Sequence, residues 1–343
     1  MPSNRAAWQD QAGTALSIRP LAHPTELAPN QLLVHVQAWA INPCDYMLQD
    51  IALPFVKYPV ILGEDVAGTV VQAGTEAATR FKINDRVLAF AEGAVHGAAQ
   101  GGFQEYVVVD SKVTCPIPEW MGYAEASVFP LGLHTAAHGL FNREALALPL
   151  PTPNSDTTSN KDKCVLIWGG ASSVGSNAIQ LARAAGLDVL VTASAKNFEY
   201  VKKLGASKVF DYNRDDVVVQ ITSELAGGAA CVGILQAAGS NDSIEPCLEI
   251  SRRAKDDILV ITTTPPQEGV VPDGVRAKMI FGFEQEDTRA VWEEFLPRAL
   301  EKRAFLVAPE PWVMDTKGID GIQEGFDALR KGVSAKKIVV LAE

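Results

Sequence analysis

The sequence predicts an α/β protein with two domains, a partly barrel-shaped β domain and a doubly wound domain built on a parallel sheet. Its 343 residues exceed the length that one hydrophobic core usually spans. The first third contains short strand-like runs interrupted by Pro and Gly, whereas strand-like and helical segments alternate from Lys163 onward. Because such alternation is typical of βαβ units, we expect the later region to form the parallel sheet.

The strands of the β domain are predicted from four runs that precede a change to helical spacing near Ala124. These runs are Leu32 to Ala38, Val66 to Val71, Asp85 to Phe90 and Phe103 to Val109.

The parallel-sheet domain is predicted from segments that alternate in type. A further strand-like segment, Lys278 to Phe283, is expected at an edge of this sheet, where it would pair with a second copy in a homodimer or be covered in a monomer. The alternating strands are Cys164 to Trp168, Asp188 to Thr192 and Lys208 to Phe210, with helices at Val174 to Ala185 and Asn197 to Leu204.

The last part of the chain is predicted to return to the first domain. A helical stretch from Asp287 to Arg303 precedes a helix at Gly321 to Lys331 and a strand at Lys337 to Leu341. The segment Pro149 to Asn160, rich in Pro, Ser and Asn, is expected to be a solvated loop without a chemical role. We therefore divide the chain into 1–131 and 284–343, the β domain, and 132–283, the parallel-sheet domain.

The composition and charge exclude several classes of protein. Hydrophobic residues make up 47% and charged residues 21%, which is the balance of a globular protein with large cores. A net charge of -11 without a basic patch excludes nucleic acids and anionic membranes as partners. No signal-like N-terminus and no run of roughly 18 apolar residues occurs, so we expect a cytoplasmic protein. The five cysteines include no C-x-x-C pair, which indicates reduced thiols rather than disulfides or a cysteine-rich zinc site.

A phosphate-binding turn is predicted between the first strand and the first helix of the parallel-sheet domain. Gly170 and Gly175 hold the outer positions of a G-x-G-x-x-G pattern, and Ser172 replaces its middle glycine. A strand followed by such a turn and a helix would leave backbone N–H groups and the positive end of the helix dipole facing a pyrophosphate. The sequence therefore favours a Rossmann dinucleotide-binding domain. The alternative is a tight turn without a ligand.

The residues after the second strand of this domain favour NADPH over NADH. An NAD site usually carries Asp or Glu about 20 residues beyond the turn, to accept from the ribose 2′-hydroxyl. This strand leads instead into Ser194, Lys196 and Asn197, which offer a cation and hydrogen-bonding groups to a 2′-phosphate. The alternative is that Lys196 is a solvated lysine at the start of a helix.

Together with these features, three short motifs resemble the medium-chain dehydrogenase/reductase superfamily. They are Asn42 to Tyr46, Leu62 to Val70 and Asp85 to Val87. Within the superfamily, the chain is most similar to the zinc-free quinone and enoyl reductases, particularly the fungal stand-alone (trans-acting) enoyl reductases that serve polyketide synthases. The closer likeness lies in Ser172 to Gly175, Ser194 to Asn197, Phe210 to Tyr212 and Val333 to Lys337.

The resemblance implies a GroES-like first domain, an inserted Rossmann domain and a cofactor cleft between them. It implies a pyrophosphate site at Gly170, Ser172, Ser173, Val174 and Gly175, and an adenosine 2′-phosphate and ribose site at Ser194, Lys196, Asn197 and Tyr212. The nicotinamide end would lie near Cys44, Asp45, Tyr46, Met47, Thr135, Val333 and Ser334.

The resemblance also implies that both zinc sites of the zinc-dependent relatives are absent. Asn42 stands where the first cysteine ligand would align, and Glu64 replaces the histidine of a Gly-His-Glu run. The counterpart of the second ligand, Val128 to His134, and that of the structural zinc lobe, Ala91 to Gln100, contain no cysteine. Because a catalytic zinc needs about three protein ligands, we expect no metal.

Loss of the metal favours conjugate reduction over reduction of a simple ketone. Zinc stabilises a developing alkoxide, whereas hydride attack on the β-carbon of an α,β-unsaturated carbonyl spreads charge into an enolate. A hydrogen-bond donor and a proton source then suffice, and the candidates are Tyr46, Thr135 and His134. Tyr46 has a structural alternative as a packed aromatic, and His134 as a satisfied structural histidine. Met47 stands where many fungal relatives have lysine, which argues against a lysine-assisted reaction.

The expected substrate is therefore an enoyl thioester, an enone or a quinone, with NADPH as the cofactor. The resemblance points to secondary metabolism with a polyketide synthase as partner, although the sequence does not decide whether a synthase is needed. Three alternatives stay open: a non-redox cyclase or binding protein on the same fold, a metal-free carbonyl reductase, and a hard-metal site at Glu64, Asp65 and His134.

Overall fold

The computed structural model describes residues 3–151, 160, 162–254, 257–282 and 286–343. The chain forms two compact units, Met1–Leu131 with Leu300–Glu343 and Gly132–Ala299. Of the predicted loop from Pro149 to Asn160, residues 152–159 lie outside the described residues.

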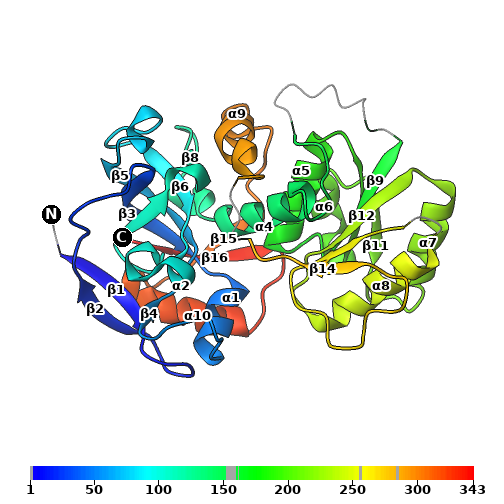
Figure 1. The fold of residues 1–343 in the computed structure, drawn as a ribbon, viewed down its shortest axis with the longest axis horizontal. Coiled ribbons are helices and arrows are strands. Elements are labelled where there is room, and N and C mark those ends of the chain that lie inside the picture. Colours follow the sequence, from blue (N-terminus) through cyan, green and yellow to red (C-terminus); the bar gives the residue numbers. More distant parts are fainter. Residues whose placement is uncertain (1–2, 152–159, 161, 255–256, 283–285) are drawn as a thin grey trace. The chain divides into compact units, whose positions relative to one another are not determined.

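The first unit is built mainly of β-strands (Figure 1). A small sheet has the order β2-β1-β4, and a larger one has the order β15-β16-β3-β5-β6-β8, with β7 paired to β3. The small sheet consists of β1 (Asn4–Gln9), β2 (Ser17–Leu21) and β4 (Val60–Ile61). The larger sheet consists of β3 (Gln31–Ala40), β5 (Asp65–Ala73), β6 (Arg86–Phe90), β7 (Tyr106–Asp110), β8 (Thr114–Pro116), β15 (Glu310–Val313) and β16 (Lys336–Leu341).

Three of the four predicted strands in this unit fall within β3, β5 and β6, apart from the first residue of the third. The fourth was expected to begin at Phe103, but β7 begins at Tyr106. The Phe103 backbone bonds elsewhere, since its N–H donates to Leu62 and its carbonyl accepts from Ala7. Its ring is fully buried, and it packs at a centroid distance of 5.5 Å from Phe326.

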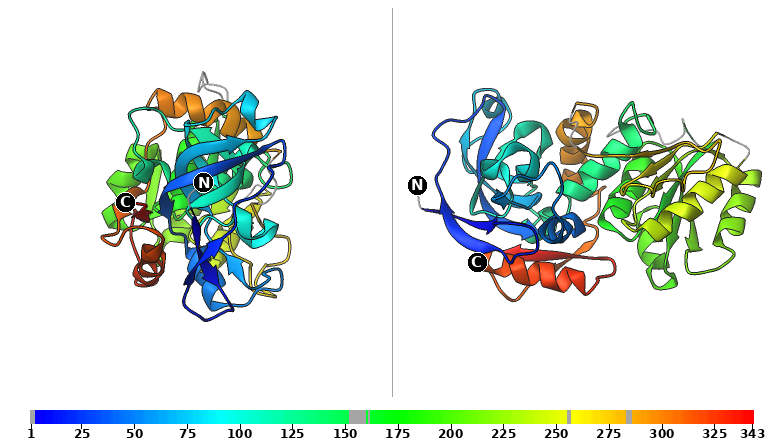
Figure 2. Two further views of the ribbon diagram at one scale, coloured as in Figure 1. Left: turned by 90° about the vertical axis from the view of Figure 1, so that its left-hand side faces the viewer. Right: turned by 60° about the horizontal axis from the view of Figure 1, so that its bottom comes forward.

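Short helices complete the first unit. Helix α10 lies alongside the terminal strand β16 (Figure 2), and it buries Ile322 and Phe326 completely. The end of the chain thus supplies both a strand and a covering helix to the first unit. The helices are α1 (Pro43–Asp50), α2 (Gly93–His96), α3 (Tyr123–Ala126) and α10 (Ile322–Arg330), with single turns η1 (Ala77–Thr79), η2 (Ala98–Gln100), η3 (Ser111–Val113) and η7 (Ile319–Gly321).

The second unit is a doubly wound parallel sheet, as the sequence predicts. Its strands have the order β11-β10-β9-β12-β13-β14 and are parallel throughout. Helix α5 packs against α6, and α7 packs against α8. Because crossovers between parallel strands are right-handed and the chain moves in opposite directions from β9 and β12, the two pairs cover opposite faces. The strands are β9 (Lys163–Trp168), β10 (Asp188–Ala193), β11 (Lys208–Asp211), β12 (Ala230–Gln236), β13 (Val260–Thr262) and β14 (Ala277–Met279).

The helices of the second unit flank this sheet (Figures 1 and 2). The expected edge strand is β14, which lies at the end of the sheet order but stops at Met279, and Phe283 lies outside the described residues. The helices are α4 (Pro130–Phe141), which enters this unit from the first, α5 (Ser173–Ala184), α6 (Phe198–Leu204), α7 (Val217–Gly227), α8 (Ile244–Arg253) and α9 (Leu296–Glu301), with short turns η4 (Ala195–Asn197) and η5 (Asn241–Ser243) and a π-helical turn η6 (Val291–Phe295).

The second unit extends further along the chain than the sequence suggested. We expected the return to the first unit at residue 284, but residues 286–299 belong to the second unit. The reason is the η6 turn, where Val291 and Trp292 are fully buried and the indole Nε1 of Trp292 donates to Nδ1 of His134 in α4 at 3.2 Å. The apolar face of this turn therefore holds the segment to the second unit.

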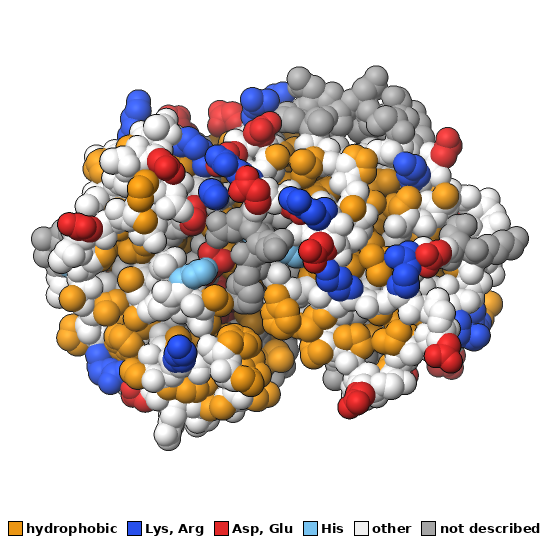
Figure 3. All heavy atoms as spheres, viewed as in Figure 1, with side chains coloured by type: hydrophobic (Ala, Val, Ile, Leu, Met, Phe, Trp, Pro, Cys, Tyr) orange, Lys and Arg blue, Asp and Glu red, His pale blue; other side chains and the backbone are white. Residues whose placement is uncertain are grey.

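The described helices and the charged side chains on one face bear on possible partners. Among the described residues, no helix has the length and apolar character needed to cross a membrane. Acidic and basic side chains alternate over the face shown in Figure 3, without a continuous basic field.

Candidate active site

The phosphate-binding turn lies at the carboxyl end of β9, where ligands bind in open α/β sheets. Helix α5 begins at Ser173 with Ser172 as its N-cap, and the Ser172 hydroxyl accepts a hydrogen bond from the N–H of Gly175 at 2.9 Å. The N–H groups of Ser173 and Val174 have no carbonyl to bind within the helix. The turn therefore presents these N–H groups and the positive end of the α5 dipole to an anion.

The two outer glycines of the turn are required by close packing. A Cβ on Gly175 would lie 2.3 Å from the carbonyl oxygen of Gly169, and one on Gly170 would lie 2.2 Å from Cγ1 of Val191. Ser172 has extended backbone with φ of -74°, which any residue adopts. Serine is thus compatible with the middle position, where it also supplies the helix cap.

A tyrosine that the sequence analysis did not identify supports the turn. The Ser176 hydroxyl donates to the carbonyl oxygen of Gly170 at 3.2 Å and lies 2.8 Å from the hydroxyl of Tyr200 in α6. Burial raises the pKa of Tyr200 to about 12, so its hydroxyl remains protonated. Hydroxyl spacing in two separate helices carries no recognisable sequence signal, which is why this support was missed.

The residues predicted to recognise the 2′-phosphate lie on neighbouring strand ends. Strands β10 and β11 are parallel, with Ala193 paired to Asp211, so the segments that follow them start side by side. The Asn197 amide donates to the Ser194 hydroxyl at 3.2 Å, and the Tyr212 side chain is 43% exposed. The residues gathered at this edge of the sheet are Ser194, Lys196, Asn197 and Tyr212.

A carboxylate also occurs at this edge, at the end of β11 rather than of β10. Asp211 Oδ1 accepts from the backbone N–H of Asn213 at 3.0 Å and from its side-chain amide at 2.8 Å. This oxygen caps the local turn, and β10 itself ends without a carboxylate.

In the first unit, the N-terminus of α1 is held by two aspartates. Asn42 is the N-cap, and its backbone N–H donates to Oδ2 of Asp45 at 2.7 Å. Its side-chain amide donates to Oδ2 of Asp65 at 2.9 Å. Asp65 begins β5, and its Oδ1 accepts from the N–H of Leu131 at 2.5 Å. Asp65 thus ties together the starts of α1 and β5 and the first turn of α4.

Lys337 supplies the cation of this network. Its side chain is 3% exposed, and Nζ lies 2.7 Å from Oδ2 of the fully buried Asp65. The ammonium also donates to Oδ1 of Asn42. Strand β16 brings the lysine there, since the carbonyl of Ile338 accepts from the N–H of Ile41 at 2.9 Å. Lys337 was not predicted as a site residue, although a lysine near the start of an apolar terminal strand indicates a buried partner.

Cys44 and Glu64 form a second pair beside this ion pair. The Cys44 thiol donates to Oε2 of Glu64 at 3.0 Å, and both side chains are partly exposed. Burial raises the pKa of the Glu64 carboxyl to about 7. Burial, with the nearby Glu64 charge, raises the pKa of the Cys44 thiol well above its usual value. At neutral pH, Cys44 is therefore a thiol and Glu64 exchanges its proton readily.

Asp45 adds a further carboxyl group to the cluster. Its side chain is 1% exposed, and its Oδ1 has no hydrogen-bond partner among the described residues. Burial, and then the charge of Glu64, raise the pKa of Asp45 well above its usual value. Since one ammonium, Lys337, faces the carboxyl groups of Asp45, Glu64 and Asp65, the cluster holds protons at neutral pH.

The donor atoms of this cluster fit a zinc ion poorly. Cys44, Asp45 and Glu64 each bring one donor atom within 4.8 Å of the others. However, the thiol is protonated and bonded to Glu64, and Asn42, at the position of the first cysteine ligand, has both amide atoms engaged. The ammonium of Lys337 already occupies the carboxylate cluster, and a divalent ion beside it would be opposed by like charge. We therefore assign no metal to these residues.

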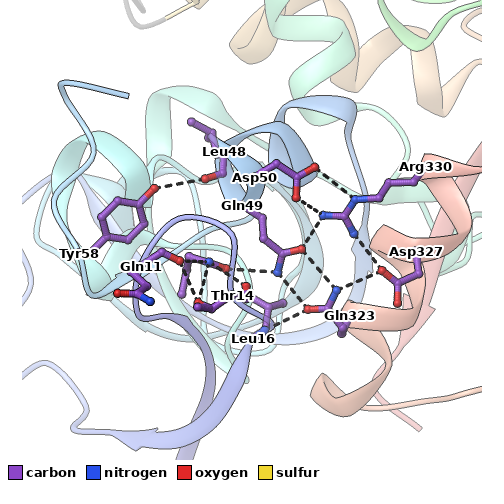
Figure 4. Close-up of polar contacts among 11 residues, drawn as sticks. Gln11, Thr14, Leu16, Leu48, Gln49, Asp50, Tyr58, Gln323, Asp327 and Arg330 are labelled. Carbon is purple, nitrogen blue, oxygen red and sulfur yellow. Dashed lines mark hydrogen bonds and ion pairs between the residues drawn. The ribbon is translucent and has the colours of Figure 1, made fainter. Parts of the chain in front are cut away.

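Helix α1 is attached to α10 by the side-chain network in Figure 4. Gln49 and Gln323 exchange amide hydrogen bonds of 3.0 and 3.3 Å. Arg330 donates to Oε1 of Gln49 and to Oδ1 of Asp50, both at 2.7 Å. These contacts fix the rotation of α1 about its own axis.

Tyr46 belongs to this α10 side of α1. The Arg330 guanidinium lies 5.4 Å from the centre of the Tyr46 ring, which also packs against the core of the first unit. Residues two apart in a helix differ by about 200° around its axis, so Tyr46 and Cys44 face different directions. Met47 is 43% exposed. Tyr46 and Cys44, both predicted at the nicotinamide end, thus face different directions from α1.

Val333 and Ser334 precede β16 in the same unit. Val333 packs against the core and Ser334 is exposed. Lys337, which bonds Asn42 at the start of α1, follows them in the chain. The grouping of Cys44, Asp45, Val333 and Ser334 at the nicotinamide end stays a prediction.

The remaining candidates, His134 and Thr135, lie in α4. The His134 ring accepts from Trp292 through Nδ1, bonds the backbone of Gly282 and is 0% exposed. Burial lowers the pKa of His134 to about 4, so the ring is neutral and enclosed at neutral pH. These contacts favour the structural alternative over a proton source or a metal ligand. Thr135 is partly exposed.

Comparison with known proteins identifies the family. The alcohol dehydrogenase GroES-like domain matches residues 28–119, and the zinc-binding dehydrogenase model matches residues 173–293. The chain belongs to the medium-chain dehydrogenase/reductase superfamily, whose members are oxidoreductases that bind a nicotinamide cofactor.

Full-length relatives support this assignment. The dehydrogenase azaJ of Aspergillus niger is 40% identical, with 99% of each chain covered. The trans-enoyl reductase himH of Aspergillus japonicus is 38% identical, with 98% of this chain and 97% of himH covered. An alcohol dehydrogenase superfamily protein from Novosphingobium aromaticivorans has the same fold, with a TM-score of 0.77, 27% identity and coverage of 99% and 100%.

The Glu64 carboxyl leads to a prediction about stability and pH. Because its pKa is raised to about 7, the folded protein holds a proton that the unfolded chain releases near pH 4.3. The protonated Glu64 carboxyl contributes fully to the free energy of unfolding below the pKa of Glu64 in the unfolded chain. This contribution is lost as pH rises through about 7. In Glu64→Gln the neutral amide removes this loss, so we expect the variant to gain stability relative to the native protein between pH 5 and pH 8 in urea unfolding.

Glu105→Gln, at another partly exposed glutamate of the first unit, is the matched control for loss of one carboxylate. If the difference in the free energy of unfolding between Glu64→Gln and the native protein is the same at pH 5 and pH 8, Glu64 has an ordinary pKa.

Proposed function

We propose that the protein catalyses NADPH-dependent, zinc-independent reduction of an activated C=C bond in an enoyl, enone or quinone substrate. The observation that carries this proposal is the cluster at the start of α1, where a buried ammonium lies beside protonatable groups. The family resemblance aligns Asn42 and Glu64 of this cluster with zinc ligands of the zinc-dependent relatives. Reduction of a ketone forms an alkoxide, which a metal ion would stabilise as a Lewis acid. Conjugate reduction forms an enolate, and the protonatable groups of this cluster could supply the proton that it needs.

The relatives favour the same chemistry. The himH protein is named a trans-enoyl reductase, and its likeness extends over nearly the whole of both chains. This supports an acyl-thioester substrate and a role in secondary metabolism, in which a polyketide synthase would present the substrate.

The residues proposed to bind the cofactor are given for each unit by itself. The α5 turn, from Ser172 to Gly175, binds the pyrophosphate through backbone N–H groups, and Lys196, with its neighbours at the β10 and β11 ends, binds the 2′-phosphate. Reduced nicotinamide supplies a hydride when bound. Cys44, Val333 and Ser334 are the first-unit residues proposed for the nicotinamide end, with Thr135 from α4.

The reaction class is tested by incubating the purified protein with NADPH and a panel of enoyl thioesters, enones and quinones. We expect NADPH oxidation that depends on substrate, with enoyl and enone products that keep the C=O group and no stoichiometric zinc in the protein. An alcohol product would identify a carbonyl reductase, and absence of NADPH consumption would favour a non-redox role. Zinc bound at one equivalent would refute the metal-free site.

The cofactor preference is tested by Lys196→Ala. A charge-assisted hydrogen bond contributes about 1.5–3 kcal/mol, so loss of this lysine should lower kcat/KM for NADPH by roughly tenfold or more and leave that for NADH nearly unchanged. Lys202→Ala is the control, because Lys202 pairs with Glu199 on the exposed side of α6. A native preference for NADH would contradict the proposed 2′-phosphate site.

The role of Tyr46 is tested by Tyr46→Phe, which keeps the ring beside Arg330 and removes only the hydroxyl. If this hydroxyl donates to the substrate, turnover should fall tenfold or more, which is the size usual for general acid catalysis. Unchanged turnover would assign Tyr46 to the packing of α1 against α10.

A further inference from the structure

The Cys44–Glu64 pair is the partly exposed part of an otherwise buried polar cluster. Asn42, Asp65 and Lys337 are each 3% exposed or less, and their polar atoms bond one another. Cys44 and Glu64 are more exposed, and the hydrogen bond between them is 3.0 Å long. The pair therefore joins the buried cluster to the surface of the first unit.

The groups around Glu64 come from three elements. Cys44 and Asp45 face it from α1, Asp65 adjoins it at the start of β5, and Lys337 faces it from β16. Asp65 is bonded to Lys337, to Asn42 and to a backbone N–H, so both of its carboxyl oxygens are already engaged. The exchangeable protons of the cluster are thus those of Glu64, Cys44 and Asp45.

We propose that Cys44 and Glu64 form the proton relay that protonates the α-carbon of the substrate after hydride transfer. The inference rests on the proposed function, in which Cys44 lies at the nicotinamide end. Cys44 is the catalytic residue, because its thiol would touch the reacting carbon. Glu64 is a positioning and proton-supplying residue that acts through Cys44.

The relay balances in atoms and charge. Hydride addition to the β-carbon reduces the C=C bond by two electrons, taken from the nicotinamide, and leaves an enolate. The S–H bond of Cys44 breaks as the C–H bond at the α-carbon forms. The thiolate then takes the proton of the Glu64 carboxyl, and Glu64 recovers a proton from water.

The geometry favours Cys44 over Tyr46 for this step. The Cys44 thiol already points at a carboxyl group whose pKa, about 7, suits proton exchange at neutral pH. The Tyr46 ring lies against Arg330 on another face of α1. No comparable carboxyl partner is recorded for the Tyr46 hydroxyl among the described residues.

The test uses a 2-methyl-2-enoyl N-acetylcysteamine thioester, whose reduction creates a stereocentre at the α-carbon. Turnover and product configuration are measured between pH 5.5 and 9 for the native protein, Glu64→Gln, Cys44→Ala and Cys44→Ser. Glu105→Gln is the control for removal of a partly exposed carboxylate outside the cluster. NADPH affinity, measured by fluorescence, checks that each variant still binds the cofactor.

The native protein should lose turnover as pH rises through about 7, because Glu64 must carry a proton to refill the thiol. Glu64→Gln should lower kcat by about 100-fold at pH 6 and lose this inflection, with NADPH affinity unchanged. Cys44→Ala should be as slow and give a mixture of α-configurations, since water would then protonate the enolate. Cys44→Ser should recover part of the rate, because a hydroxyl also passes protons.

A second readout needs no cofactor. Cys44 is the partly exposed thiol among the five cysteines, the other four being buried. In Glu64→Gln, the loss of a negative neighbour and acceptor should lower the thiol pKa and speed alkylation of Cys44 by iodoacetamide at pH 8.5, as measured on its peptide by mass spectrometry.

The outcomes separate the two proposals. A native protein that reduces none of the enoyl probes refutes the proposed function. If the native protein reduces the probe but Glu64→Gln and Cys44→Ala keep its rate, pH inflection and α-configuration, the relay is wrong and the proposed function stands. An unchanged alkylation rate in Glu64→Gln likewise overturns the link between the two side chains.

Discussion

The buried ion pair between Lys337 and Asp65 determines how the first unit positions the start of helix α1. Removing one partner of such a pair typically costs 3–5 kcal/mol, because the other charge is left without compensation. Lys337 comes from the last strand of the chain and Asp65 from β5, and both bond the side chain of Asn42 at the start of α1. The C-terminus thus fixes the helix that carries Cys44.

The same pair explains why the carboxyl groups beside it tend to be protonated and why their donor atoms suit a metal ion poorly. A single ammonium compensates Asp65, and the neighbouring Asp45 and Glu64 then have raised pKa values because burial and mutual repulsion disfavour further negative charge. Relatives that hold zinc solve the same electrostatic problem with thiolate and imidazole ligands around a divalent cation. Here the cation is the Lys337 side chain, and the raised pKa values of Asp45 and Glu64 are the basis of the proton-transfer role that we propose.

The second unit depends on a different constraint, the close approach of helix α5 to strand β9. Gly170 and Gly175 leave no room for a Cβ, and Ser172 caps the helix between them. Parallel pairing of β10 with β11 then brings the proposed 2′-phosphate residues to one edge. Local sequence predicted each of these parts, since a turn of small residues between a strand and a helix has few other structures available. It also predicted the doubly wound sheet and most of its strands.

The sequence by itself determined the fold class and the turn of small residues between β9 and α5, because each follows from residue types at short spacing. Tertiary structure alone decided that Lys337 meets Asp65 and Asn42, that Cys44 meets Glu64, and that Tyr46 faces Arg330. It likewise enclosed His134 under Trp292 and kept residues 286–299 with the second unit. The physical reason is that burial and partner choice set the charge of these groups, and both arise from contacts between segments far apart in the chain.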